Sequence, residues 1–406
     1  MPPTINATGC KRSANKGHIE SKHQIPLLLK TSVHVPLLPI AQAQHNPVLK
    51  HNMSAIERFG RRFENILLRE PPATDPLRWI SHEIEGISHR FAQPLTLTPY
   101  AAVQDCSARC CFCSENLRDQ QMIGRRAAAL RPDPLYFTHL RTALASLRGL
   151  PLSYSLSGLE STDDPEWLLE LLATLQNPDD GPNVEDSVMY SNGAGLVEHT
   201  DLLVPALSAF GLSAIEWSRH HDMPETNQRI MRFRAGQRVA RQDAFEQTLG
   251  RVNPHIPVKL VCVVQRGGIV TPDDVLRYID WAHRLGVSSV IFREFSELPA
   301  SYSNNATRRY IDSARVPIEE LLEACLAERR FRAHHQPLAL TSGYYFWNAR
   351  WLTARQQEVI FEKSDYATLL AHESSGLIYK LVFHANAHLC AGWQPDHHVL
   401  WRPHAG

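Results

Sequence analysis

The chain has 406 residues and a formal net charge of zero, because its 42 lysine and arginine residues balance its 42 aspartate and glutamate residues. This balance does not support general nucleic-acid binding, which needs a basic surface, and the 43% hydrophobic content indicates a globular protein with one large core or two ordinary ones. No run of about 18 apolar residues occurs, so the sequence predicts no membrane-spanning helix. The cysteines are unevenly spaced, unlike a secreted disulfide framework, and favour a reducing cytoplasm.

The first 52 residues are expected to form a disordered leader. Basic residues precede an apolar stretch at 25–44, as in a signal peptide, but a lysine, a histidine and several prolines interrupt the stretch, and it begins late in the chain. Met53 directly precedes the first amphipathic segment, so we expect Met53 to be the biological start, which the intact mass of the native protein tests. Residues 53–93 are then expected to form an N-terminal helical segment.

Residues 94–334 alternate short apolar runs with segments of helical periodicity, which predicts repeated βα units and a parallel sheet. The expected strands are 94–103, 151–158, 186–193, 212–218, 257–264 and 288–295. The expected helices are 135–150, 164–177, 199–209, about 240–250, 271–286 and 316–331. Six such units predict an α/β protein with a partial (β/α)6 TIM-like barrel, in which the chemistry sits at the carboxyl ends of the strands.

The sequence changes character after the predicted barrel. Residues 358–365 and 376–393 have β-like patterns, and the second resembles a hairpin that turns near Asn386. We therefore expect 335–406 to be an antiparallel β-rich appendage that caps the substrate.

Histidine and cysteine residues in this hairpin leave two interpretations open. His384, His388 and Cys390 are candidates for a metal site, but ordinary hairpin packing or substrate contact is favoured, because the expected turn separates the two histidines. Cys390 is also a candidate hydrogen-atom donor. Cys262 lies inside an apolar strand pattern and is expected to be a buried packing residue.

A cysteine cluster follows the first predicted strand. Cys106, Cys110 and Cys113 have the spacing C-x3-C-x2-C, and Cys111 lies between them. Thiolates suit iron–sulfur clusters or zinc, but a structural zinc site usually takes four ligands as two separated pairs, and no second pair occurs here. Three ligands for a four-iron cluster leave one iron open to a small molecule.

With the aromatic residue Phe112 just before the last cysteine, this stretch resembles the signature of the radical S-adenosylmethionine (SAM) superfamily. In its sequence pattern the chain most resembles the molybdenum-cofactor GTP cyclase branch, but it lacks the second cysteine triad of that branch. The resemblance implies a [4Fe–4S] cluster on Cys106, Cys110 and Cys113, SAM as a cofactor, and an electron donor such as flavodoxin or ferredoxin. Cys111 is interpreted as a bystander, although it is able to compete as a ligand.

Weaker matches follow the later strands. Gly158 and Glu160 are similar to the family's Gly-Gly-Glu turn, which meets the SAM amino group, although Leu159 replaces one glycine. Asn192 stands where the family has Thr-Asn-Gly. Ser218 is a candidate for the SAM ribose or carboxylate.

Two arginines remain as candidates. Arg219 is expected either to meet the SAM carboxylate or to pair with Asp222. Arg293 ends the sixth predicted strand, in a segment similar in texture to the Arg-Phe-Ile-Glu segment of the cyclase branch, and it either points into the barrel or makes a surface salt bridge.

The resemblance implies reductive cleavage of SAM to a 5′-deoxyadenosyl radical that abstracts hydrogen from a small-molecule or peptide substrate. In that chemistry the cofactor supplies the reactivity, and the protein supplies orientation and excludes water. Two alternatives stay open. One is transfer of the 3-amino-3-carboxypropyl group of SAM to a nucleophile, and the other is a non-catalytic iron–sulfur or zinc protein.

Overall fold

The computed structural model describes residues 50–68, 79–117, 131–176, 181–298, 302, 304–343, 345–366 and 376–404. All of the described residues belong to one compact unit, Leu37–Gly406. Most of the expected leader, up to residue 49, lies outside the described residues.

Six adjacent parallel strands form the centre of the sheet, as the sequence predicted. They are β3 (Ile87–Tyr100), β4 (Pro151–Leu156), β5 (Asn183–Ser191), β6 (Ala214–Ser218), β7 (Val258–Val263) and β8 (Ser289–Arg293). Their order in the sheet follows their order in the chain, and every neighbouring pair is parallel. This arrangement confirms the partial barrel.

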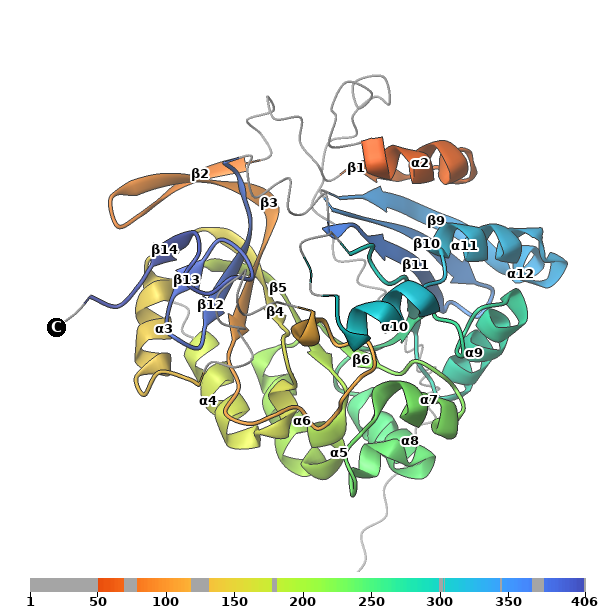
Figure 1. Ribbon diagram of the computed structural model, residues 1–406, viewed down its shortest axis with the longest axis horizontal. Coiled ribbons are helices and arrows are strands. Elements are labelled where there is room, and N and C mark those ends of the chain that lie inside the picture. The colour runs from red at the N-terminus through yellow and green to blue at the C-terminus, as the bar shows by residue number, and fades with distance from the viewer. Residues whose placement is uncertain are drawn as a thin grey trace, which may run out of the picture. The chain divides into compact units, whose positions relative to one another are not determined.

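The crossover helices lie along the outer side of the curved sheet (Figure 1). They are α3 (Tyr136–Ala145), α4 (Pro165–Leu175), α5 (Ala194–Glu198), α6 (Thr200–Phe210), α7 (Pro224–Met231), α8 (Gln242–Val252) and α9 (Pro272–Arg284). Local sequence sets where they begin. The Asp164 carboxylate accepts a hydrogen bond from the Trp167 amide at 3.0 Å, and Thr271 with Asp274 forms a capping box at the start of α9.

The two faces of the strands differ in chemistry. Leu156, Trp217 and Phe292 are buried in the main core, which they share with the helices. Because successive side chains of a strand point to opposite faces, the alternate positions, such as Glu216 and Arg293, face away from the helices. We call this second face, which carries Thr96, Ser155, Tyr190, Glu216 and Arg293, the inner face. It is polar at many positions where the outer face is apolar.

The C-terminal strands extend both edges of the barrel sheet, and they do not form one separate appendage. Strands β9 (His335–Ser342), β10 (Phe346–Thr353) and β11 (Glu358–Ser364) are antiparallel to one another, and β11 pairs in parallel with β8. Strand β12 (Ile378–His384) pairs in parallel with β3 at the other edge, followed by β13 (Leu389–Cys390) and β14 (Val399–Trp401). The central parallel array therefore gains one strand at each edge.

The hairpin predicted near Asn386 is confirmed. Strands β12 and β13 are antiparallel, with Val382 opposite Cys390 and Phe383 opposite Leu389. The region 335–406 thus has two halves that lie at different edges of the barrel. Strands β9 to β11 join the edge at β8, and strands β12 to β14 join the edge at β3.

The expectation of a helical segment over 53–93 is wrong beyond its first turns. Helix α2 (Lys50–Phe59) is followed by a short 3-10 helix, Gly60–Arg62, and then by β1 (Ile66–Leu68), which pairs with β9. Strand β2 (Trp79–Ile84) forms a hairpin with β3, and its two-residue turn has positive φ angles at Glu85 and Gly86. Such a turn matches the right-handed twist of a two-stranded ribbon.

The remaining helices are α10 (Ala306–Ala314), α11 (Ile318–Ala327) and α12 (Arg329–His334). In the described parts of the chain, none of the helices combines the length and the apolar character needed to cross a membrane.

Candidate active site at the cysteine loop

The cysteine loop begins directly after β3, at the carboxyl edge of the parallel sheet. The thiols of Cys106, Cys110 and Cys113 are half-buried and free of disulfides. Cys111 is buried, and its thiol donates to the Arg229 carbonyl at 3.5 Å. The Cys111 thiol therefore points to the α7 backbone, and the Cys110 thiol lies 3.8 Å from the Met231 sulfur.

The carboxyl end of α7 holds the cysteine loop through backbone hydrogen bonds. The Arg109 amide donates to the Met231 carbonyl at 3.2 Å, and the Cys111 amide donates to the Ile230 carbonyl at 3.1 Å. The chain leaves α7 through Arg232, whose φ is 51°, and the two segments then form an isolated bridge between Ala108 and Phe233. The carboxyl end of α7 thus anchors the loop.

The loops after β4 and β5 bind the other side of the cysteine loop. The Ser107 amide donates to the Asp163 carboxylate at 2.7 Å. The side-chain amide of Asn192 donates to the Ser107 hydroxyl at 3.0 Å and lies 3.5 Å from the Cys106 sulfur. Asn192 is 7% exposed, so these contacts are largely shielded from water. The structure therefore brings Asn192 to the cysteines.

Glu160 joins the turn after β4 to the end of β5. Its carboxylate accepts from the Thr162 hydroxyl at 2.6 Å, the Ser191 hydroxyl at 2.7 Å and the Asn192 amide. Burial, with a contribution from Asp163, raises the pKa of Glu160 to about 7, although these hydrogen bonds act in the opposite direction. The structure places Glu160 beside Asn192, with both carboxylate oxygens already bonded to protein donors.

Gly158 has no room for a side chain. Its φ is +90°, and a Cβ at this position lies 1.7 Å from a carbon of the Tyr100 ring. The close approach lets the turn after β4 pack directly on the last residue of β3. The sequence match at Gly158 thus has a steric reason in this chain.

The expected pairing of Arg219 with Asp222 is wrong. Its guanidinium donates to the Gln242 side chain at 2.6 Å and lies 4.5 Å from the centre of the Phe245 ring, and the residue is 1% exposed. Asp222 pairs with Arg277 at 3.0 Å. Arg219 therefore packs against α8, because the aromatic ring and the amide outweigh a pairing with Asp222. Burial lowers its pKa to about 10.

Ser218 is the last residue of β6, two positions after Glu216, so it stands on the inner face as a ligand-binding position requires. His220, two positions after Ser218, was not among the site residues predicted from the sequence. The Phe112 ring lies 5.0 Å from the His220 ring and 5.2 Å from Phe295. His220 Nδ1 accepts from the Val263 amide at 3.0 Å, and burial lowers the pKa of His220 to about 3, so the ring is neutral.

Arg293 points to the inner face. It donates to Glu362 at 2.7 Å and to Glu216 at 3.2 Å. Burial lowers the pKa of Arg293, but the two carboxylates outweigh burial and raise it. Glu362 belongs to β11, so a residue of the C-terminal region completes this cluster. A surface salt bridge is excluded for Arg293, because the side chains of Glu216 and Glu362 are only 10% and 18% exposed.

The donor set of the cysteine loop fits an iron–sulfur cluster. Burial raises the pKa of Cys106 to about 12 and raises those of Cys110 and Cys113, and the charge of each neighbouring thiolate opposes ionisation of Cys110. Three adjacent thiols that resist ionisation need a cationic group to become thiolates, and iron is such a group. Among the described residues, no three His, Cys, Asp or Glu side chains form a site for a single metal ion.

The hairpin residues make contacts of ordinary packing. His388 Nδ1 lies 3.0 Å from the Asp396 carboxylate, His384 Nε2 lies 3.3 Å from the Gly392 carbonyl, and Cys390 is fully buried. Cys262 is fully buried, as predicted.

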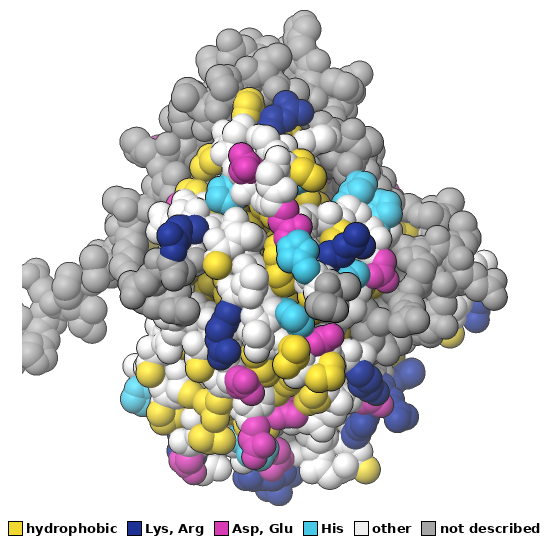
Figure 2. Space-filling view, turned by 90° about the vertical axis from the view of Figure 1, so that its left-hand side faces the viewer, with side chains coloured by type: hydrophobic (Ala, Val, Ile, Leu, Met, Phe, Trp, Pro, Cys, Tyr) yellow, Lys and Arg dark blue, Asp and Glu magenta, His cyan; other side chains and the backbone are white. Residues whose placement is uncertain are grey.

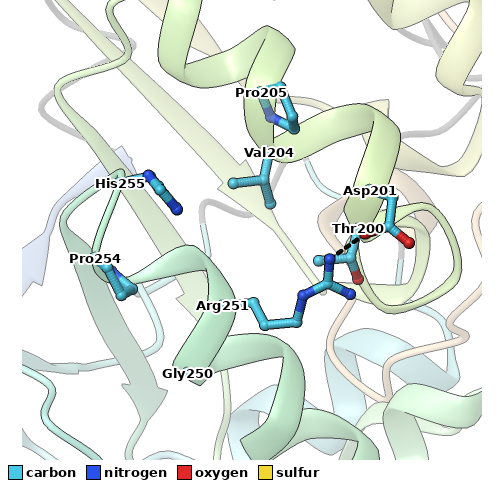
Figure 3. Close-up of a pocket in the computed structure, with 8 residues that line it drawn as sticks. All are labelled: Thr200, Asp201, Val204, Pro205, Gly250, Arg251, Pro254 and His255. Atoms are coloured by element: carbon cyan, nitrogen blue, oxygen red, sulfur yellow. Dashed lines mark hydrogen bonds and ion pairs between the residues drawn. The ribbon is translucent and has the colours of Figure 1, made fainter. Parts of the chain in front are cut away.

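A pocket of about 260 Å³ lies between α6 and α8, on the helical side of the sheet (Figure 3). Arg251 pairs with Asp201 across it, and none of its lining residues belongs to the cysteine loop or to the inner face. The face shown in Figure 2 intersperses acidic, basic and histidine side chains, in keeping with the neutral composition.

No family model matches the chain, and no curated protein matches it in sequence. Among solved structures, the chain is similar to anSMEcpe with bound AdoMet and a Cp18Cys peptide, at 14% identity over 49% of this chain and 50% of that chain, with a TM-score of 0.36. It is also similar to SuiB of Streptococcus suis bound to S-adenosylmethionine, at 14% identity over 74% of this chain and 60% of that chain, with a TM-score of 0.45.

A third similar structure is coproporphyrinogen III oxidase (HemN) of Escherichia coli, described as a radical SAM enzyme, at 12% identity over 60% of this chain and 53% of that chain, with a TM-score of 0.40. The chain spans about half the length of anSMEcpe and of HemN.

Proposed function

We propose that this protein is a radical SAM enzyme, with a [4Fe–4S] cluster on Cys106, Cys110 and Cys113. The observation that carries the proposal is that the four cysteines of the loop have different surroundings. Three thiols are half-buried and form no disulfide, and Cys106 and Cys113 act electrostatically on Cys110, whereas Cys111 is buried with its thiol on the Arg229 carbonyl. The arrangement leaves three ligands at the carboxyl edge of a parallel sheet.

The cluster, when bound, would supply the electron that cleaves a carbon–sulfur bond of SAM and so yields a 5′-deoxyadenosyl radical. The protein holds the cysteine loop in position. Asp163, Asn192 and the end of α7 hold the loop from both sides, so the thiols do not depend on the metal alone for their arrangement. Gly158, Ser218 and Phe112 are proposed to contact SAM, because each lies at the carboxyl end of a strand or in the loop itself.

The substrate is proposed to be a small molecule or a peptide that binds along the inner face. The polar side chains of this face come from the barrel strands and from β11 and β12, so the C-terminal region contributes to its two edges. An electron donor such as flavodoxin or ferredoxin is part of the proposal, since the chain itself offers no second cysteine triad.

The test is mass spectrometry of SAM products after anaerobic reconstitution with iron and sulfide and reduction by dithionite. We expect 5′-deoxyadenosine from the wild-type protein and none from Cys106→Ala/Cys110→Ala/Cys113→Ala. The matched control is Cys111→Ser, which keeps a donor for the Arg229 carbonyl and is expected to form product like the wild type.

Other outcomes decide between the alternatives. Methylthioadenosine in place of deoxyadenosine would indicate aminocarboxypropyl transfer. Neither product from a protein with a full complement of iron would indicate a non-catalytic iron–sulfur protein, and a colourless zinc-loaded protein would remove the enzyme hypothesis.

A further inference from the structure

We propose that Lys380, together with Thr96 and Thr98, forms a receptor on the inner face for an anionic group of the substrate, either a carboxylate or a phosphate. This inference rests on the proposed function only in taking the inner face as the place where substrate binds. It assigns a role to strand β12, which lies outside the six-strand barrel.

Strand β12 places Lys380 beside the strand that leads to the cysteine loop. Lys380 is in register with Thr96 of β3, and Val382 is in register with Thr98. Leu381 belongs to the main core, so its neighbour Lys380 faces the opposite side, which is the inner face. In Figure 1, β12 lies next to β3, away from β11 across the sheet.

The ammonium group of Lys380 has few partners. Its Nζ donates to the Thr96 hydroxyl at 3.3 Å and lies 4.5 Å from the centre of the Trp393 ring. No ion pair joins it to a carboxylate of the described residues. An ammonium group has three donors, and one hydroxyl accepts one of them. Thr98 lies two positions after Thr96 on β3, and its hydroxyl is buried with no hydrogen-bond partner in the described part of the protein.

This lack of an anion has an energetic cost. Burial of a cation without an opposite charge is unfavourable, and it lowers the pKa of Lys380 to about 7. The Trp393 ring offsets only part of the hydration that the Lys380 ammonium group loses. An anion that approaches along the inner face would accept from Lys380 and from the Thr98 hydroxyl together, and would restore the charged form.

Two other cations of the inner face lie beside carboxylates. Arg293 is paired with Glu216 and Glu362. Lys259 stands in register with Glu216. An anionic substrate group therefore has its best partner at the β3–β12 edge, because Lys380 has no carboxylate partner among the described residues, whereas Arg293 is already paired with two.

The experiment is carbon NMR of the full chain after reductive ¹³C-methylation of its lysines, which keeps their charge. The Lys380 signal is assigned by its absence from Lys380→Arg. Lys363, which lies on β11 at 4.0 Å from Glu319, is the matched control because it already has a carboxylate neighbour. The probes are inorganic phosphate and acetate, each added in the absence of SAM and reductant.

We expect one or both probes to move the Lys380 signal saturably and to raise its apparent pKa by about one unit, which is a tenfold preference of the anion for the charged form, while the Lys363 signal stays in place. A response to phosphate alone assigns a phosphate group, and a response to acetate alone assigns a carboxylate. The inference is overturned if neither probe moves the Lys380 signal more than that of Lys363. Because SAM chemistry is not involved, a Lys380 response without deoxyadenosine formation would leave this site standing and remove only the enzymatic proposal.

Discussion

The side-chain amide of Asn192 lies 3.5 Å from the sulfur of Cys106, although 86 positions separate the two residues in the chain. The same amide donates to Ser107, and its oxygen accepts from the Ala194 amide at 2.8 Å. One side chain at the end of β5 thus ties down the beginning of the cysteine loop. Four experiments test this and related arrangements.

Asn192→Ala is expected to loosen the cysteine loop. The variant loses hydrogen bonds in a buried environment, so the free energy of unfolding should fall by about 1–3 kcal/mol, and iron retained after reconstitution should fall with it. Urea unfolding and iron analysis measure the two effects. Asn183→Ala, at the exposed start of β5, is the control and should stay within about 0.5 kcal/mol of the wild type. Equal effects of both substitutions would contradict the role of Asn192.

Gly158→Ala should be far more damaging than a glycine substitution without steric conflict. A Cβ at Gly158 meets the Tyr100 ring at 1.7 Å, whereas a Cβ at Gly211 meets nothing within 4 Å, although both residues have positive φ. Gly211→Ala should therefore cost only the backbone strain of about 1–2 kcal/mol, and Gly158→Ala should cost clearly more or displace β3. Chemical denaturation of both variants gives the comparison, and similar losses would show that the Tyr100 contact is unimportant.

Glu160 should make the stability of the protein depend on pH. Burial raises its pKa from 4.5 to about 7, so between these values the folded protein keeps a proton that the unfolded chain has lost. The stabilisation that this proton gives the folded protein is fully present below pH 4.5, the pKa of Glu160 in the unfolded chain. It is lost as the pH rises to about 7, which lowers the free energy of unfolding by about 3 kcal/mol in all.

Glu160→Gln cannot titrate, so the difference in unfolding free energy between wild type and variant should change over this pH window and become constant above it. Denaturant titrations at several pH values measure that difference. A difference that is the same at all pH values would mean that Glu160 is ionised throughout.

Arg293→Met should destabilise the protein by leaving two carboxylates of the inner face unpaired. We expect a loss of about 2 kcal/mol, below the figure for a fully buried pair because the Arg293 side chain is 28% exposed. Arg293→Met/Glu216→Gln should recover part of the loss, since one unpaired charge is gone. A double-mutant cycle from thermal or urea unfolding measures the coupling, and strictly additive losses would argue against a direct Arg293–Glu216 interaction.

Much of the barrel could be predicted from local patterns. The apolar runs at 151–158 and 257–264, each followed by a segment of helical periodicity, specify a strand and the helix after it, because the periods of two and 3.6 are properties of a few adjacent residues. The cysteine loop could be located for the same reason, since its four cysteines lie within eight positions of one another.

The direction of individual long side chains was not predictable in this way. Arg219 had a carboxylate three positions away and still packs on Phe245, because α8 brings a ring and an amide closer to it. Glu362 reaches Arg293 only because β11 joins the edge of β8. Such contacts depend on which strands become neighbours.

The sequence by itself determined the α/β class, the alternation of strands and helices along the chain and the three-cysteine motif, since each of these follows from spacing along a short stretch of chain. Only the tertiary structure decided that β11 and β12 extend opposite edges of the sheet, that Cys111 turns to the Arg229 carbonyl, and that Lys380 stands on the inner face. The physical reason is that strand pairing and burial depend on contacts between residues far apart in the chain, and no local pattern specifies those partners.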